Sequence, residues 1–223
     1  MSLAETLRRS TIPRLVVGLS RVEWPAQWSA RLRRSMSRPA KMDLFFAYDD
    51  PYAAIALPNL IRIARQRGAV LTLYPLLTRG IADDPAAAAR QRHAVEDSAR
   101  LAKRNGRTLS RREPIHAADC AFLASWTESA RHDTGVLNFA AAALDRLWFQ
   151  SSGAINESDF RRLHSQHLHS AAVANNHQAL ARNTEKLLKL GHWESPAVLV
   201  EGQWFLAHER LTQIDDHLAH LGW

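Results

Sequence analysis

Cysteine is nearly missing from this sequence: Cys120 is the only one among 223 residues. A lone cysteine cannot form a disulfide within the chain, and a CxxC dithiol motif is impossible. Dithiol oxidoreductase chemistry is therefore excluded, and a reducing compartment, the cytoplasm, is the expected location. Cys120 lies in a helical, mostly apolar stretch, so we expect a small buried thiol and not a nucleophile.

Long apolar runs are missing too. The longest run near the N-terminus covers residues 15–19, and no later stretch reaches the roughly 18 residues of a membrane-spanning helix, so we expect a soluble protein that is not secreted. GxGxxG, Walker, GxSxG and HExxH motifs are absent, which leaves the common nucleotide, hydrolase and zinc-protease sites without support. His164, His167, His169 and His177 have no acid or cysteine at a recognised spacing, so no metal site is expected.

The excess of positive over negative charge lies at one end of the chain. Residues 1–41 carry nine Lys and Arg against two acidic residues, and this segment accounts for the whole net charge of +7. The neutral remainder argues against nucleic-acid binding by the body, because that binding needs a basic face. Two interpretations of this basic arm remain open. It packs on the body or a partner with its arginines in solvent, or it contacts an acidic partner, nucleic acid or membrane surface.

After residue 41 the pattern is typical of alternating strands and helices. Residues 43–48 are an apolar and aromatic run, which predicts a buried strand. Asp50 and Pro51 follow as helix cap and first helical residue, and Gly68 ends the predicted helix. Residues 70–75 predict a second strand, and a strand-helix-strand unit with a short return implies a parallel pair.

The second half of the pattern predicts helices, then a hairpin and a last helix. Residues 84–190 show only helical periodicity, enough for about four or five helices. Residues 197–200 and 203–206 predict two strands joined across Gly202, which form an antiparallel hairpin. The last helix is expected from His208 to about Leu221.

Three segments resemble the DsbA-like branch of the thioredoxin superfamily. They are Phe-Phe-Ala-Tyr-Asp-Asp-Pro-Tyr at residues 45–52, Gly-His-Trp-Glu-Ser-Pro and the following strand at 191–202, and Trp-Phe-Leu-Ala-His-Glu-Arg-Leu at 204–211. The likeness is greatest to 2-hydroxychromene-2-carboxylate isomerases and kappa-class glutathione transferases, and it covers about residues 42–223. It implies an α/β thioredoxin-like fold (βαβ…ββα). The thioredoxin-like domain would comprise residues 42–83 and 191–223, with an all-helical insert at 84–190.

The resemblance also implies a site and a cofactor, glutathione. Ser195–Pro196 would be a cis peptide bond whose backbone meets the ligand. The positions that receive the γ-glutamyl group in glutathione-binding relatives match His208 and Glu209. Substrate contacts are expected from the aromatic and acidic residues around the first helix and the proline loop: Tyr48, Asp49, Tyr52 and Trp193. A homodimer that binds a small molecule or thiol peptide is expected.

Asp50 departs from the family pattern, which has serine or cysteine at this position. The helix dipole should keep Asp50 ionised, and an ionised carboxylate would repel a thiolate. Asp50 is either a helix cap or a carboxylate that acts as a general base or binds a cationic substrate group, and these functional roles require a partly buried site and a raised pKa. Two functions therefore remain open: a glutathione-dependent isomerase or transferase, or a catalytically silent binding or dimerisation module whose aromatic arm residues cover the cleft.

Overall fold

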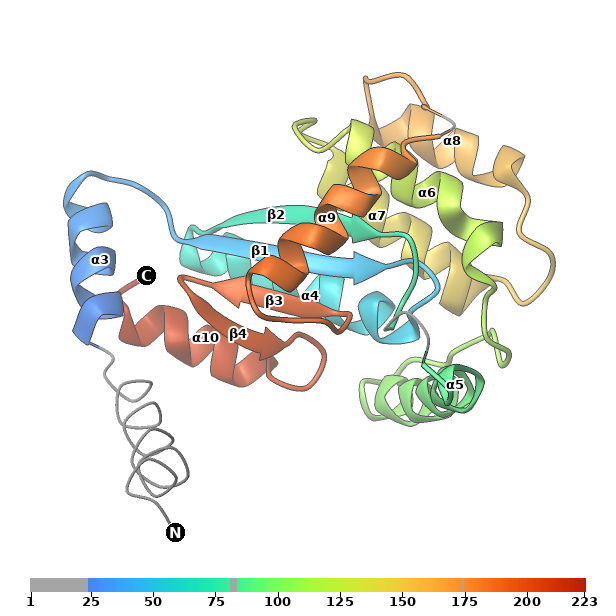
Figure 1. The fold of residues 1–223 in the computed structure, drawn as a ribbon, viewed down its shortest axis with the longest axis horizontal. Coiled ribbons are helices and arrows are strands. Elements are labelled where there is room, and N and C mark those ends of the chain that lie inside the picture. Colours follow the sequence, from blue (N-terminus) through green and yellow to red (C-terminus); the bar gives the residue numbers. More distant parts are fainter. Residues whose placement is uncertain (1–23, 81–83, 174) are drawn as a thin grey trace, which may run out of the picture.

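A four-stranded mixed sheet lies at the centre of the computed structural model, which describes residues 24–80, 84–173 and 175–223 (Figure 1). The strands are β1 Lys41–Ala47, β2 Val70–Leu76, β3 Ala197–Val200 and β4 Gln203–Leu206. Their order across the sheet is β2-β1-β3-β4, and β1 pairs parallel with β2 and antiparallel with β3. The predicted parallel pair and the predicted antiparallel hairpin are both confirmed.

The helix α4, Pro51–Arg67, begins and ends where the sequence predicted. Asp50 caps its N-terminus, because the backbone N–H of Tyr52 donates to the Asp50 side chain. Gly68 ends the helix in the left-handed conformation, with φ of 62°, which residues with a side chain rarely adopt. Because a short turn joins β1 to α4, the N-terminus of α4 lies beside the carboxyl end of β1.

The described residues between 84 and 190 contain helices and no strand, as predicted. The elements are α5 Ala87–Arg104, α6 Ala117–Ser129, α7 Val136–Asp145 with the π-helical turn η2 Arg146–Gln150, α8 Glu157–His167 and α9 His177–Lys189. In the part of the chain that the structure describes, no helix is long and apolar enough to cross a bilayer.

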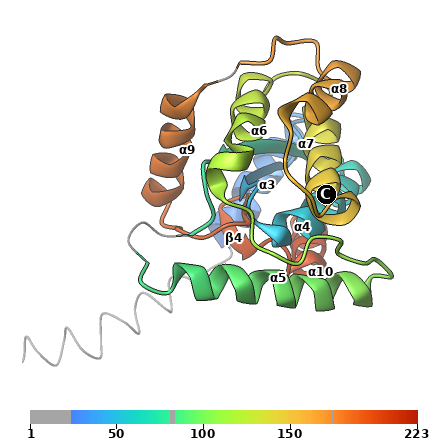
Figure 2. The ribbon, with the colours of Figure 1, turned by 90° about the vertical axis from the view of Figure 1, so that its right-hand side faces the viewer.

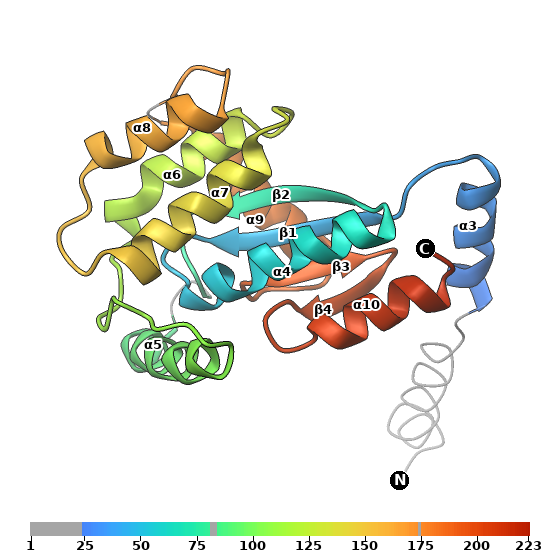
Figure 3. The same ribbon diagram turned by 180° about the vertical axis from the view of Figure 1, so that it is seen from behind.

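Both faces of the sheet are covered by helices. The helices α4 and α10, Leu211–His220, cover one face (Figure 3), and the core on that side continues without a break to α6 and α7. The helix α9 covers the other face, where Leu187 packs with Phe45 and Leu76. Although α9 falls in the range predicted as insert, it packs on the sheet. The predicted start of the last helix at His208 is wrong, because residues 207–209 form a turn and α10 begins at Leu211.

The basic arm is described only from residue 24 onward, and its first 23 residues lie outside the described part. The described part forms the helix α3, Trp24–Ser35, at the end of the sheet that also holds the C-terminus (Figure 1). The guanidinium of Arg34 donates to the carbonyl of Gly222 at 3.1 Å. The helix α3 therefore lies far from the N-terminus of α4, and its Trp28 does not cover the cleft there.

Candidate functional site

Three segments distant in sequence meet at the carboxyl end of β1. They are the β1–α4 turn with Asp49 and Asp50, the loop that follows β2, and the loop before β3 that contains Ser195 and Pro196. The Ser195–Pro196 peptide bond is cis, which is the geometry that the family resemblance implied. The hydroxyl of Ser195 donates to Asp50 Oδ2 at 2.9 Å and accepts from the Ala47 N–H at 3.1 Å. The proline loop is thereby fixed directly to the cap of α4.

Asp50 is fully buried and sits beside one cation. Its Oδ1 atom accepts from the Tyr52 N–H at 3.1 Å and lies 3.5 Å from Arg79 Nε. Burial raises the pKa of Asp50 to about 7, against the opposing charge of Arg79 and with a smaller upward contribution from Asp49. The expectation that the helix dipole keeps this carboxylate ionised is therefore corrected, since desolvation is the larger effect. Near neutral pH both protonation states of Asp50 are populated.

Asp49, the neighbouring carboxylate, positions the loop after β2. Its side chain accepts from the hydroxyl of Thr78 at 2.7 Å and from the backbone N–H of Arg79 at 2.9 Å. Its pKa is raised by burial. Because Asp49 binds the backbone of the residue whose side chain reaches Asp50, the two aspartates act together to place the Arg79 guanidinium.

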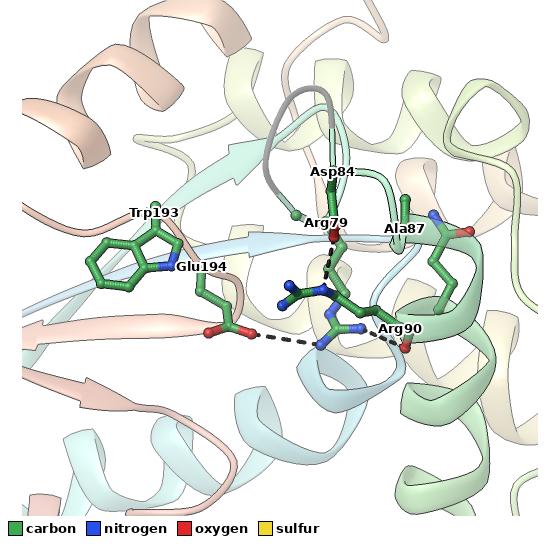
Figure 4. A pocket seen from close by; sticks show the side chains of 8 residues that line it. Arg79, Asp84, Ala87, Arg90, Trp193 and Glu194 are labelled. Atoms are coloured by element: carbon green, nitrogen blue, oxygen red, sulfur yellow. Dashed lines mark hydrogen bonds and ion pairs between the residues drawn. The ribbon is translucent and has the colours of Figure 1, made fainter.

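A cavity of about 420 Å³ opens beside the first turn of α4. Helix α5 supplies one of its walls, and Figure 2 shows this helix running along one side of the body. The lining combines cationic, acidic and aromatic side chains: Tyr52, Arg79, Ala89, Arg90, His93, Glu194, Leu206, His208 and Glu209. In Figure 4, which shows the adjoining hollow, Arg79 points toward Glu194 and Arg90 toward Asp84.

One wall of the cavity is an aromatic pair. The rings of Tyr52 and His208 stack with centroids 3.9 Å apart, and the Tyr52 hydroxyl donates to Asp97 Oδ2 on α5 at 3.0 Å. Burial, aided by the charge of Arg79, lowers the pKa of His208 to about 4, so its imidazole is neutral at pH 7. Its Nδ1 atom is buried and has no hydrogen-bond partner among the described residues. The hydrogen-bonding capacity of that atom is therefore unused in the wall of the cavity.

The structure brings only part of the predicted site together. Tyr52, His208 and Glu209 line the cavity, while Asp50 and Ser195 lie buried behind it. Pro196 is also buried, and Trp193 is exposed at the rim of the adjoining hollow.

Tyr48 does not line this cavity, and the substrate contact predicted for it stays a prediction. Its side chain is buried toward the insert, where its hydroxyl and Thr127 Oγ1 are hydrogen-bonded at 2.6 Å. The substrate contact predicted for Asp49 also stays a prediction, and both of its carboxylate oxygens are engaged by the loop after β2. Cys120 is buried, and burial raises the pKa of its thiol, as expected for an inert residue.

Arg79 is the most central of the cavity residues that sequence reasoning missed, and Arg90 and Glu194 were missed as well. Arg79 touches Asp50, Glu194 and the Tyr52 ring, and its guanidinium carbon is 5.2 Å from the ring centroid. A signal was available, because Arg79 follows β2 just as Asp50 follows β1. The carboxyl ends of parallel strands meet at one edge of a sheet, where ligands commonly bind.

Comparisons with solved structures identify the fold. No protein-family model matches the chain, and no curated protein matches it. Among solved structures, 2-hydroxychromene-2-carboxylate isomerase is similar with a TM-score of 0.60 at 14% identity, covering 81% of this chain and 95% of that one. A probable DsbA oxidoreductase from Streptomyces coelicolor has a TM-score of 0.58 at 11% identity, covering 82% and 89%. A putative protein disulfide isomerase from Nitrosomonas europaea has 0.56 at 14%, covering 83% and 100%. The chain therefore has the DsbA-like form of the thioredoxin fold.

Proposed function

We propose that this protein binds glutathione or a related thiol peptide in the cavity beside α4, and acts there as an isomerase or transferase on a small aromatic acid. The observation that carries the proposal is the cavity itself, which is lined by Arg79, Arg90 and His208 and by Glu194, the residue before the cis Ser195–Pro196 bond. The similar fold of 2-hydroxychromene-2-carboxylate isomerase supports the reaction class. We include a cytoplasmic location, which the single cysteine supports, and a homodimer in the proposal.

The residues present fit a thiol peptide with two carboxylates and one amino group. Arg79 and Arg90 are suited to bind carboxylates, and the unpartnered Nδ1 of His208 can accept or donate one further hydrogen bond. Glu209 at the rim can bind the amino group. When bound, glutathione supplies the thiol nucleophile. The residues of the chain hold the peptide and exclude water from its thiol.

Asp50 has a proton-holding role in this proposal. A carboxyl group with a pKa of about 7 can both release and accept a proton at neutral pH, which suits general acid-base work. Its neutral form can donate a hydrogen bond, as the serine of the related enzymes does, so a thiolate need not be repelled. Since Asp50 is fully buried, Arg79 must move aside before a ligand atom reaches Oδ1.

The test is calorimetric titration of glutathione into the full chain and three variants, Asp50→Ser, Arg79→Gln and Arg100→Gln. Arg100 is exposed on α5 and lies outside the cavity, so its variant is the matched control. Millimolar or tighter binding that Arg79→Gln weakens and Arg100→Gln preserves would support the proposal and justify turnover assays. Binding only by Asp50→Ser would show that the carboxylate has closed the thiol site, and no binding by any form would overturn the proposal.

A second function is favoured by the burial of Asp50. Its carboxylate is fully engaged by Ser195, the Tyr52 N–H and Arg79, which is the arrangement of a structural cap. In that case the protein is a catalytically silent thioredoxin-fold module that binds a partner or dimerises. It would show neither glutathione binding nor turnover, and sedimentation would reveal whether two copies associate.

A further inference from the structure

The helix α3 packs on the body with one face, and its opposite face carries large apolar side chains that are about half exposed. Gln27 is hydrogen-bonded to His220, Ala30 is fully buried, and Arg34 donates to the C-terminal segment. At 100° per residue these three positions share one side of the helix. Trp28 and Leu32 project from the other side, as does Met36 in the turn that follows the helix.

The outward face is an apolar ridge. Trp28, Leu32 and Met36 are spaced four residues apart and are 57%, 63% and 47% exposed. Residues at this spacing lie next to each other along a helix, so the three side chains form one continuous strip. Single exposed apolar residues need no explanation, but such a strip on one short helix marks an interaction surface.

The surroundings of this ridge are cationic. Arg31 and Arg38 are exposed and form no ion pair with any described residue. The segment 1–41 to which α3 belongs carries the whole net charge of the protein, +7. A short helix with tryptophan and leucine on one side and arginine beside them is the pattern of helices that lie in the interface of a bilayer.

We propose that α3 binds the surface of an anionic lipid bilayer, with Trp28, Leu32 and Met36 in the headgroup region and the arginines on lipid phosphates. Charge favours an anionic membrane over a second copy of this chain as the partner of the ridge. Two copies of this segment would bring like charges together, whereas anionic lipids attract them, at about 1 kcal/mol per Lys or Arg near the surface. Because α3 lies at the opposite end of the sheet from the cavity, docking would leave the cavity open (Figure 1).

The experiment is co-sedimentation of the full chain with vesicles of phosphatidylcholine alone and of phosphatidylcholine mixed with phosphatidylglycerol. We expect binding only to the anionic vesicles, and binding that weakens as salt screens the charges. Leu32→Gln should reduce this binding about tenfold, the effect of removing part of one leucine's burial. Leu188→Gln is the control, since Leu188 is 57% exposed on α9.

Three results would overturn the proposal. The first is absence of binding to anionic vesicles, and the second is equal loss of binding in Leu32→Gln and Leu188→Gln. The third is sedimentation velocity in which Leu32→Gln dissociates a dimer while vesicle binding is unchanged, because a second copy would then occupy the ridge. Thermal unfolding of each variant checks that it is folded. Because both leucines are exposed, we expect both variants to unfold at nearly the same temperature as the unchanged protein.

Discussion

The two ends of the central sheet are built in opposite ways. At the carboxyl end of β1 two carboxylates, Asp49 and Asp50, are buried and surrounded by hydrogen bonds. At the other end the apolar side chains of Trp28 and Leu32 on α3 are exposed. The first end hides groups that prefer water, and the second shows groups that avoid it. Buried carboxylates and exposed apolar strips are both features that occur preferentially at functional sites.

The two arrangements affect the stability of the folded state differently. A buried carboxylate with a raised pKa makes the folded state less stable whenever it is ionised, and such groups gather at functional sites. An exposed apolar ridge on an outlying helix costs the fold little, because the body does not depend on it. Substitutions at the carboxylate end should therefore change stability strongly, and substitutions on α3 should not.

The largest change in stability is expected between the wild type and Asp50→Asn, and the size of this difference should depend on pH. The pKa of Asp50 is about 7 in the folded state against 3.8 in a model peptide, so between pH 4 and 7 the folded state holds a proton that the unfolded state has lost. Wild-type stability relative to the variant should fall as pH rises, by up to about 1.4 kcal/mol per pH unit and about 4 kcal/mol over the interval. Chemical denaturation at a series of pH values measures it. A constant difference between the two proteins would mean that the pKa of Asp50 is normal.

His208 should produce a pH dependence of the opposite sign. Its pKa is about 4 in the folded state against 6.5 in a model peptide, so between these values the unfolded state binds the extra proton. Wild-type stability relative to His208→Phe should therefore rise with pH from 4 to 6.5, by up to about 1.4 kcal/mol per unit. Phenylalanine keeps a ring against Tyr52, which limits the effect of lost stacking. The same denaturation series tests this, and a difference that falls with pH would contradict it.

Arg79→Met should lower the free energy of unfolding by about 2–3 kcal/mol at pH 8, because it leaves the buried Asp50 without its cation. The cost should shrink at pH 5, where Asp50 is protonated. Arg100→Met is the control, since Arg100 and Glu96 form an exposed pair at 3.9 Å worth about 0.5 kcal/mol or less. In the double variant with Asp50→Asn the effect of Arg79→Met should largely vanish. An equal cost in both backgrounds would show that Arg79 acts through packing and not through Asp50.

Tyr52→Phe should have a smaller effect, about 1 kcal/mol. It removes the hydroxyl that donates to Asp97 and so links α4 to α5, while the stacking on His208 is kept. Urea unfolding at neutral pH measures the loss. Unchanged stability would indicate that this link between the thioredoxin-like half and α5 contributes nothing, and that the cavity wall is held by packing alone.

Local signals in the sequence predicted the fold well. Asp50, Pro51 and Gly68 act on their own helix, so the limits of α4 follow from neighbouring residues. The strands follow from short apolar runs for the same reason. The last helix was placed too early because residues 207–209 form a turn whose geometry depends on the strand before it.

The site was harder to predict than the fold because it is assembled from distant segments. The contact of Arg79 with Asp50 depends on the hydrogen bonds by which Asp49 holds Thr78 and the backbone of Arg79, which join segments about 30 residues apart in the sequence. The ionisation of Asp50 was misjudged for a related reason: the helix dipole is visible in the sequence, whereas complete burial is a property of the packed structure. Tyr48 was assigned to the site by the family resemblance, and the sequence gives no sign that its side chain is buried against Thr127 of the insert.

The smallest change in stability is expected for Leu32→Gln, which should alter the free energy of unfolding by no more than about 0.5 kcal/mol. The side chain is 63% exposed and points away from the body, so its removal leaves no cavity and no unpaired group. Ala30→Glu is the contrasting variant on the inner side of the same helix. It would place a charge against the body and should release α3, which limited proteolysis would detect as faster cleavage. If Leu32→Gln destabilised the protein by several kcal/mol, the ridge would be part of the folded core, and the contrast between the two ends of the sheet would fail.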